Sequence, residues 1–167
     1  MSWFGRCSVP RRSLGRRPTV SLDDLYKETI LDHYQHPRNR GQLDDPDVAT
    51  RGHNPLCGDE ILLSLKLGDG VIDDIAHGGR GCSISQASAS MMSEGVKGQP
   101  IETAESLGAA FREMMVGSGA TDGLDGNEDL EALQGVKKFP VRVKCALLPW
   151  AALEEAIETW RKAPGRS

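Results

Sequence analysis

The chain contains no apolar run that approaches the roughly 18 residues needed for a membrane-spanning helix. It is 167 residues long and 38% hydrophobic, which is enough for an ordinary buried core. Residues 1–20 also lack the apolar segment that a secretory signal requires, so we do not expect export. These absences, together with the length, favour a single domain that neither spans nor crosses a membrane.

Acidic residues are missing from residues 1–20, which hold five arginines (Arg6, Arg11, Arg12, Arg16 and Arg17). This composition fits either an organellar transit peptide or an unpatterned, disordered extension. We predict a basic extension at 1–20, a folded domain at 21–162 and a short tail at 163–167. Without the five arginines, 15 basic residues face 24 acidic ones, a net charge of −9. Such an acidic body argues against nucleic acid as the main partner and fits a partner protein that has a basic docking face.

A disulfide framework is also absent, because the chain has only four cysteines. Cys7 lies in the basic extension, which leaves Cys57, Cys82 and Cys145, an odd number. Three thiols in one folded body indicate a metal site or a reactive thiol in a reducing compartment. We therefore expect a cytoplasmic protein.

The hydrophobic pattern predicts an antiparallel hairpin among several helices. Residues at every second position of 60–67 are apolar, and Gly68-Asp69-Gly70 is typical of a tight turn. His33 and His36 are expected at the surface of the first helix. The predicted helices are 21–36, 84–97, 101–116, 128–134 and 145–162, with Pro149 in the first turn of the last one. The predicted strands are 60–67 and 71–77, the second of which is ended by a break at 78–81. Residues 38–50 and 117–127 are predicted to be loops, and residues 137–143 a loop or a short extended run.

The cysteines lie at predicted junctions between elements. Cys57 and Asp59 are two residues apart, so one turn can direct both side chains to the same centre. Cys82 and Cys145 each precede a predicted helix, whose N-terminus favours thiolate over thiol. With 24 and 62 residues between successive cysteines, the pattern is not that of a zinc finger. The spacing alone leaves two interpretations: a metal site, or three small buried side chains.

Five motifs carry a resemblance to a known family. They are Leu25-Tyr26 through Gly41, Asn54-Pro55-Leu56-Cys57-Gly58-Asp59, Gly81-Cys82-Ser83-Ile84-Ser85 with residues 87–92, residues 131–136, and Phe139-Pro140-Val141-Arg142-Val143-Lys144-Cys145. From about Ser21 to Trp160 the chain resembles the NifU/IscU-like superfamily, and more closely its SufU branch. IscU scaffolds carry histidine directly before the last cysteine, where this chain has Lys144. Residues 117–134 resemble the insertion of the SufU branch.

The resemblance implies an α+β fold in which helices cover a small antiparallel sheet, with a metal site at one end. It implies zinc bound by Cys57, Asp59, Cys82 and Cys145, with Arg142 and Lys144 beside these ligands. The implied function is iron–sulfur cluster assembly: Cys57 accepts persulfide sulfur from a SufS-type cysteine desulfurase and works with other SUF proteins. Whether the protein turns over as a sulfurtransferase or serves as a co-substrate stays open. The alternatives are a scaffold on which a [2Fe–2S] cluster is assembled, and a purely structural zinc module.

Overall fold

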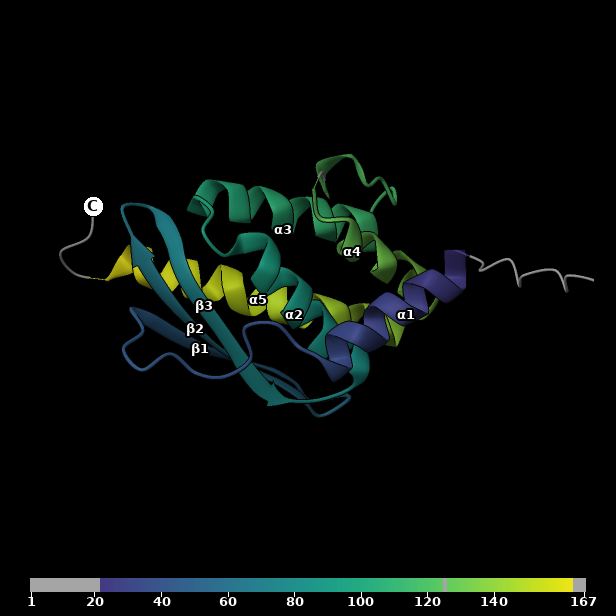
Figure 1. Ribbon diagram of the computed structural model, residues 1–167, viewed down its shortest axis with the longest axis horizontal. Helices are drawn as coiled ribbons and strands as arrows, with labels where there is room; N and C mark the ends of the chain where they lie inside the picture. Colours follow the sequence, from purple (N-terminus) through teal and green to yellow (C-terminus); the bar gives the residue numbers. More distant parts are fainter. Residues whose placement is uncertain (1–21, 125, 164–167) are drawn as a thin grey trace, which may run out of the picture.

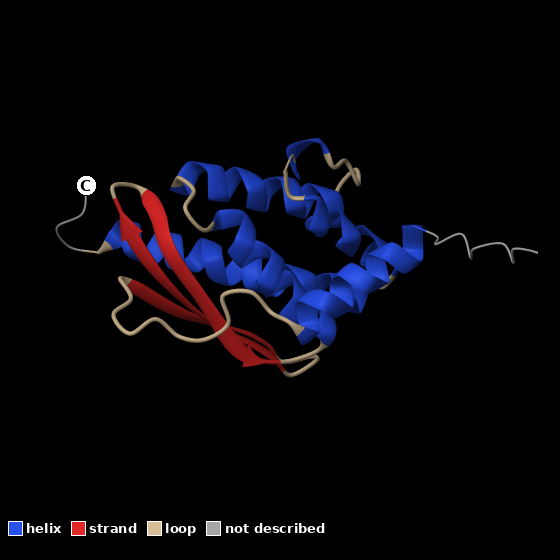
Figure 2. Cartoon of the chain, viewed as in Figure 1, coloured by secondary structure: helices blue, strands red, loops and turns tan. Residues whose placement is uncertain are grey.

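A computed structural model describes residues 22–124 and 126–163 of the chain. In this part, a three-stranded antiparallel sheet lies along one side of a group of helices (Figure 2), which confirms the predicted α+β class. The elements are α1 Leu22–Gln35, β1 Val48–Asn54, β2 Asp59–Gly68, β3 Val71–Arg80, α2 Ser83–Val96, α3 Ile101–Val116, η1 Asp122–Leu124, α4 Glu128–Glu131, η2 Ala132–Lys138 and α5 Pro140–Lys162.

The β2–β3 hairpin forms as the sequence predicts. Ile61, Leu63 and Leu65 point into the core, whereas Leu62 between them is 44% exposed. Asp69 and Gly70 both adopt positive φ, the requirement of the tight hairpin turn whose twist matches that of the flanking strands. The alternating pattern therefore sets which face of β2 is buried.

Two parts of the sheet differ from the prediction. The predicted loop 38–50 ends in β1, which pairs with β2 from Val48 opposite Leu65 to Asn54 opposite Asp59. The predicted break at 78–81 is also wrong, because β3 continues to Arg80, opposite Glu60. Gly79 adopts a φ of +104°, and a Cβ there would lie 2.1 Å from the Glu60 carbonyl oxygen. Glycine at this position therefore allows β3 to pair closely with β2, and it does not end the strand.

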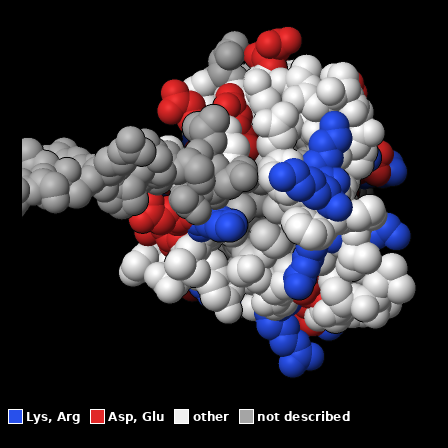
Figure 3. Space-filling view, turned by 90° about the vertical axis from the view of Figure 1, so that its right-hand side faces the viewer, with Lys and Arg blue, Asp and Glu red and all other residues white. Residues whose placement is uncertain are grey.

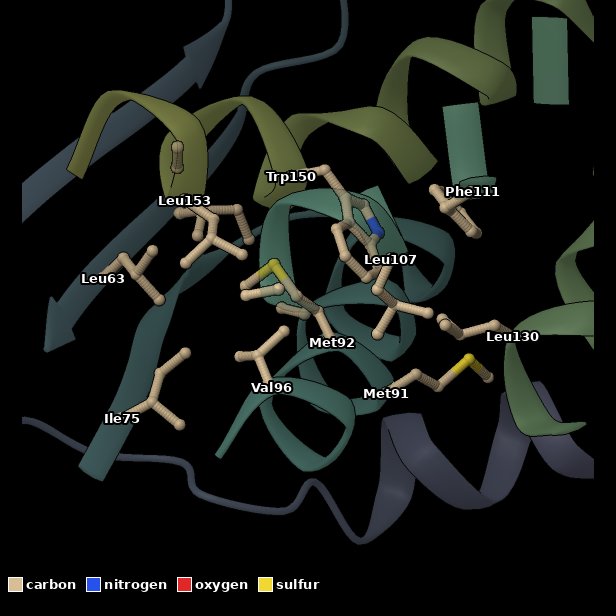
Figure 4. Packing of buried hydrophobic residues seen from close by; sticks show 14 of the residues in the cluster. Leu63, Ile75, Met91, Met92, Val96, Leu107, Phe111, Leu130, Trp150 and Leu153 are labelled. Atoms are coloured by element: carbon tan, nitrogen blue, oxygen red, sulfur yellow. The ribbon is translucent and has the colours of Figure 1, made fainter. Parts of the chain in front are cut away.

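The core forms where α2 packs against the sheet, α1, α3 and α5. Met91 and Met92 of α2 are buried together with Leu107, Phe111 and Trp150 (Figure 4). The rings of Phe111 and Trp150 stack with centroids 4.9 Å apart, which holds α3 against α5. α2 ends before Gly98, whose φ is +77°, as the sequence predicts.

The start of α5 was predicted wrongly. Residues 137–143 were expected to form a loop or a short extended run because of Pro140, but Pro140 begins the helix. Proline is favoured there, since a first-turn N–H has no partner within the helix and the fixed φ suits helical backbone. Cys145 therefore lies in the second turn of α5 and does not precede it. Pro149, expected in the first turn, lies in the interior of the helix.

Helix α5 runs beneath the length of the sheet, and its last turn lies at the opposite end of the molecule from the start of α1 (Figure 1). Its first turns lie near α1, η2 and the start of α2. None of the helices in the described residues is long and apolar enough to cross a membrane.

Candidate metal centre

The buried carboxylate of Asp59, only 1% exposed, is the meeting point of the three cysteines. Its Oδ2 lies 3.1 Å from the Cys57 Sγ and 3.4 Å from the Cys82 Sγ. Its Oδ1 accepts a hydrogen bond of 2.8 Å from the backbone N–H of Cys82. Cys145 completes the group, with its Sγ 3.4 Å from that of Cys57. The three cysteines predicted to be zinc ligands therefore lie around Asp59, with Cys57 and Cys145 in one close group with the carboxylate and Cys82 at its edge.

The loop that carries Cys57 closes the β1–β2 hairpin. The backbone oxygen of Asn54 accepts a 2.9 Å hydrogen bond from the N–H of Gly58. The Asn54 side-chain oxygen accepts a second one, 3.1 Å long, from the N–H of Leu56. Gly58 adopts a φ of +70°, which residues with a Cβ rarely do. This tight loop leaves Cys57 exposed while it directs Asp59 inward.

Cys82 lies at the N-cap of α2 with extended backbone. This places Cys82 at the start of a helix, as predicted, where the backbone N–H groups of the first turn have no partner within the helix. Ser85 supports this turn, because its hydroxyl donates a 3.1 Å hydrogen bond to the Cys82 carbonyl oxygen. A Cβ on Gly81 would lie 2.5 Å from Asp59 Oδ1, so glycine lets the backbone approach the carboxylate.

Cys145 is buried, with its Sγ 3.6 Å from the carbonyl oxygen of Val141 one turn earlier in α5. Because it lies inside the helix, the expected stabilisation of its thiolate by unpaired first-turn N–H groups does not apply. The three thiols thus differ in access: Cys57 is exposed, Cys82 is partly buried and Cys145 is buried.

Burial and hydrogen bonding shift the ionisation of this cluster. Burial acts to raise the pKa of the Asp59 carboxyl group, but hydrogen bonds from the Cys145 thiol, and next from the Cys82 backbone N–H, outweigh it and lower the pKa. Burial, followed by the hydrogen bond to Asp59, raises the pKa of the Cys145 thiol. Without a cation, Cys145 therefore retains its proton, and metal binding would release it.

Arg142 lies three residues before Cys145 in α5. Hydrogen bonding to the Cys82 side chain, followed by the charge of that side chain, raises the pKa of the Arg142 guanidinium, and the Arg142 side chain is exposed. The Lys144 side chain is exposed as well. Of the two residues expected beside the ligands, only Arg142 has a contact with them in residues 22–124 and 126–163.

The donor set fits a zinc ion. Zn–S bonds of about 2.3 Å and Zn–O bonds of about 2.0–2.2 Å place the ligand atoms of a tetrahedral site about 3.4–3.8 Å apart. The S···S and S···O distances of 3.1–3.4 Å around Asp59 are close to this spacing. Three sulfur atoms and one carboxylate oxygen have the number and chemistry of a tetrahedral zinc site. The ligand atoms of Cys57, Asp59 and Cys145 lie within 4.8 Å of one another, whereas Cys82 is outside this group and would have to move closer to bind the same ion.

A second group of metal-binding residue types, His33, Glu94 and Asp129, has a different explanation. His33 is buried rather than on the surface as predicted, with Nδ1 2.8 Å from the Ser90 hydroxyl and Nε2 2.8 Å from the Asp129 carboxylate. Glu94 lies 3.4 Å from the Arg38 guanidinium. Hydrogen bonds and ion pairs thus account for the group, and His33 links α1 to α2 and α4.

Comparison with known proteins shows the family of the chain. The family model of the NifU-like N terminal domain matches residues 25–166. The chain belongs to this family. This match confirms the resemblance drawn from the cysteine motifs. The matched residues include Cys57, Asp59, Cys82 and Cys145.

Several members of the NifU-like family are similar over most of their length. The zinc-dependent sulfurtransferase SufU of Bacillus subtilis is 50% identical over 138 residues, which cover 83% of this chain and 92% of the relative. The iron–sulfur cluster assembly scaffold protein IscU of Streptococcus pyogenes is 44% identical, covering 82% and 85%. The crystal structure of FiSufU, a SUF-system protein of Fervidobacterium islandicum, superimposes with a TM-score of 0.71 at 33% identity, covering 78% and 94%.

Asn54 and Ser85, which support the candidate ligands, were not assigned this role from the sequence. Asn54 closes the Cys57 loop and Ser85 holds the first turn of α2. Their positions beside a predicted turn and a predicted helix start could have indicated this role, because Asn and Ser side chains often form hydrogen bonds with nearby backbone groups. What the sequence alone does not show is that these two turns lie next to α5.

Proposed function

We propose that this protein takes part in iron–sulfur cluster assembly as a zinc-dependent sulfur-transfer protein, with Cys57 accepting persulfide sulfur from a cysteine desulfurase. The observation that carries the proposal is the convergence of three cysteines on Asp59 with only Cys57 exposed. A thiol that receives sulfur from another protein has to be reachable, and two partly or fully buried thiols then serve to hold the site. The similarity to SufU of Bacillus subtilis, a zinc-dependent sulfurtransferase, supports the same function.

The transfer is a thiol–disulfide exchange. The Cys57 thiolate attacks the outer sulfur of the donor persulfide, the sulfur–sulfur bond of the donor breaks, and the donor leaves as a thiolate. A new sulfur–sulfur bond forms on Cys57, and the proton of the persulfide travels with the transferred sulfur. No net oxidation or reduction occurs. Cys57 is suited to this step because its loop is exposed and closed by the hydrogen bonds of Asn54.

Zinc held by Cys57, Asp59, Cys82 and Cys145 would supply a charge that keeps the thiols deprotonated at neutral pH without redox chemistry of its own. Arg142 is proposed as a positioning residue, because its guanidinium beside Cys82 places a fixed positive charge where persulfide charge arrives. Lys144 is proposed to act only in the approach of the partner, since its side chain is exposed. A reducing compartment such as the cytoplasm suits three free thiols.

The experiment combines metal analysis with a transfer assay. Purified protein is expected to hold about one zinc ion per chain. Incubation with a cysteine desulfurase and radiolabelled cysteine should label the wild-type chain, and reduction should remove the label. Cys57→Ser should abolish labelling, whereas Cys7→Ser, a cysteine outside the converging group, should not. Labelling that persists in Cys57→Ser would contradict the role of Cys57.

The alternative is a scaffold on which a [2Fe–2S] cluster is assembled as cargo. The similarity to the IscU scaffold of Streptococcus pyogenes favours it, and the same four side chains are a ligand set of the right size. Lys144 in place of the histidine expected before the last cysteine of such scaffolds weighs against it. Iron with an equal amount of acid-labile sulfide in the purified protein, in place of zinc, would establish the scaffold function.

A further inference from the structure

A groove of about 680 Å³ lies beside the cysteine cluster, between α1, η2 and the first turns of α2 and α5. Ser83, the residue after Cys82, and Arg142, which contacts the Cys82 side chain, both line it. The groove is therefore continuous with the site that the proposed function assigns to sulfur transfer. A protein segment seated in it would lie next to Ser83 and Arg142, on the side of the cluster where Cys82 lies.

The groove has apolar walls and an exposed apolar rim. Tyr26 and Ile30 of α1 face Val136 of η2 across it, and Phe139 forms part of its edge. The Phe139 side chain is 60% exposed, and that of Val141 in the same turn is exposed to the same extent. Two large apolar side chains exposed next to an apolar groove are typical of a binding surface.

The charge of the groove is opposite to that of the chain as a whole. Lys27, Lys138 and Arg142 line it, and no acidic residue does so among the described residues. Basic side chains gather over much of the face at this end of the molecule, whereas acidic ones lie mainly toward one side (Figure 3). The net charge of the chain predicts a partner with a basic face, but the surroundings of the site call for an acidic one.

We propose that this groove is the docking site for the sulfur donor, and that it receives an apolar side chain flanked by carboxylates from the cysteine desulfurase. The inference rests on the proposed function, because the position of the groove beside Ser83, the residue after Cys82, is what links it to sulfur transfer. Phe139 and Val141 supply apolar contact area, and Lys27, Lys138 and Arg142 match the charge of the partner. The donor persulfide then reaches Cys57 from the side on which Arg142 lies.

The test measures the concentration of this protein that half-saturates sulfur transfer from the desulfurase, together with the rate at saturation. Phe139→Ala and Lys138→Glu should each raise the half-saturating concentration about tenfold, the loss typical of one interface side chain. Zinc content and the saturated rate should stay as in the wild type. The Lys138→Glu effect should shrink at high salt.

Two variants away from the residues that line the groove serve as matched controls. Leu62→Ala removes an apolar side chain of β2 that is 44% exposed, and Lys162→Glu reverses a charge in the last turn of α5. Both should leave the half-saturating concentration unchanged. If the groove variants behave like these controls while Cys57→Ser abolishes transfer, the docking site lies elsewhere although the proposed function stands. If Cys57→Ser still accepts sulfur, the proposed function itself fails, whatever the groove variants do.

Two other occupants are distinguished by sedimentation of the isolated protein. A wild-type dimer that Phe139→Ala converts to a monomer would show that a second copy fills the groove, and would overturn the proposal. A truncation to residues 22–167 that lowers the half-saturating concentration more than tenfold, with no further effect of Phe139→Ala, would show that residues of the basic extension occupy it. Monomeric protein with unchanged behaviour on truncation supports docking of the desulfurase.

Discussion

The Sγ atoms of Cys57 and Cys145 lie 3.4 Å apart, although 88 positions separate the two residues along the chain. One belongs to an exposed hairpin loop and the other to the buried second turn of α5. Packing of β1 on α5 brings them together, since Gly52 allows the strand to approach Ala152 and Leu148. The site thus depends on the docking of the sheet on the last helix.

This proximity predicts a disulfide when the metal is removed. Two thiols at this distance need a shift of only about 1.4 Å to reach the bonded length of about 2.05 Å, and the Cys57 loop is exposed. After chelation and mild oxidation, mass spectrometry of protease fragments should find Cys57 linked to Cys145. Cys82→Ser should still form this link and zinc-loaded protein should resist it. A link of Cys57 to Cys82 instead would contradict the arrangement described above.

Gly81→Ala is predicted to weaken metal binding without unfolding the protein. The added Cβ would lie 2.5 Å from Asp59 Oδ1 and 2.7 Å from the Ser85 hydroxyl, so the carboxylate has to move. A displaced ligand or its support typically costs about 10–100-fold in metal affinity. Competition with a chromogenic chelator measures the change.

Gly135→Ala is the matched control, because a Cβ at that glycine meets no atom within 4 Å. Its zinc affinity should equal that of the wild type. Equal affinity in both variants would show that Gly81 does not position Asp59.

Periodic patterns predicted β2, β3, α2 and α3, because in each a buried face repeats along the sequence. Strand β1 was not predicted, because apolar and polar residues do not alternate in its segment VATRGHN. Its contacts with α5 rest on Gly52 and on a 3.1 Å hydrogen bond from the Thr50 hydroxyl to the Ala152 carbonyl oxygen. Such pairing between distant segments leaves no local pattern. Pro140 was expected to prevent a helix, but proline also begins helices, and the local sequence does not distinguish the two roles.

The candidate site was predictable only in part from the residues themselves. Spacing places Cys57 and Asp59 in one turn, but no spacing rule joins them to Cys145 across 88 positions. The family resemblance supplied that link. The surroundings of His33 were missed because its partners, Ser90 and Asp129, lie on other helices.

His33→Ala is predicted to destabilise the fold by about 2 kcal/mol. The side chain is buried, so its loss leaves a cavity and removes the hydrogen bonds to Ser90 and Asp129. Urea unfolding followed by circular dichroism measures the difference. His36→Ala on the same helix is the control. Its exposed pair with Asp32 should contribute less than about 0.5 kcal/mol. Equal stability of the two variants would contradict the role of His33.

The last prediction concerns the dependence of stability on pH through His77. This residue is fully buried in β3, and its Nε2 lies 2.8 Å from the Arg38 carbonyl oxygen, to which it donates. Its Nδ1 has no hydrogen-bond partner in the described residues. A proton on Nδ1 would therefore be buried without an acceptor. Burial lowers the pKa of His77 below 6.5, and the nearby Arg40 charge acts in the same direction.

Between the ordinary pKa of 6.5 and the lowered value, the unfolded chain binds a proton at this position and the folded chain does not. The contribution of His77 to stability is therefore complete above pH 6.5 and is lost as the pH falls, by at most about 1.4 kcal/mol per pH unit. His77→Gln can still donate to Arg38 but does not titrate, so its stability should fall less steeply between pH 7 and pH 5. Other titrating groups, including the cysteine cluster, affect both proteins alike and cancel in the comparison. Parallel profiles for the two proteins would show that His77 does not titrate in this way.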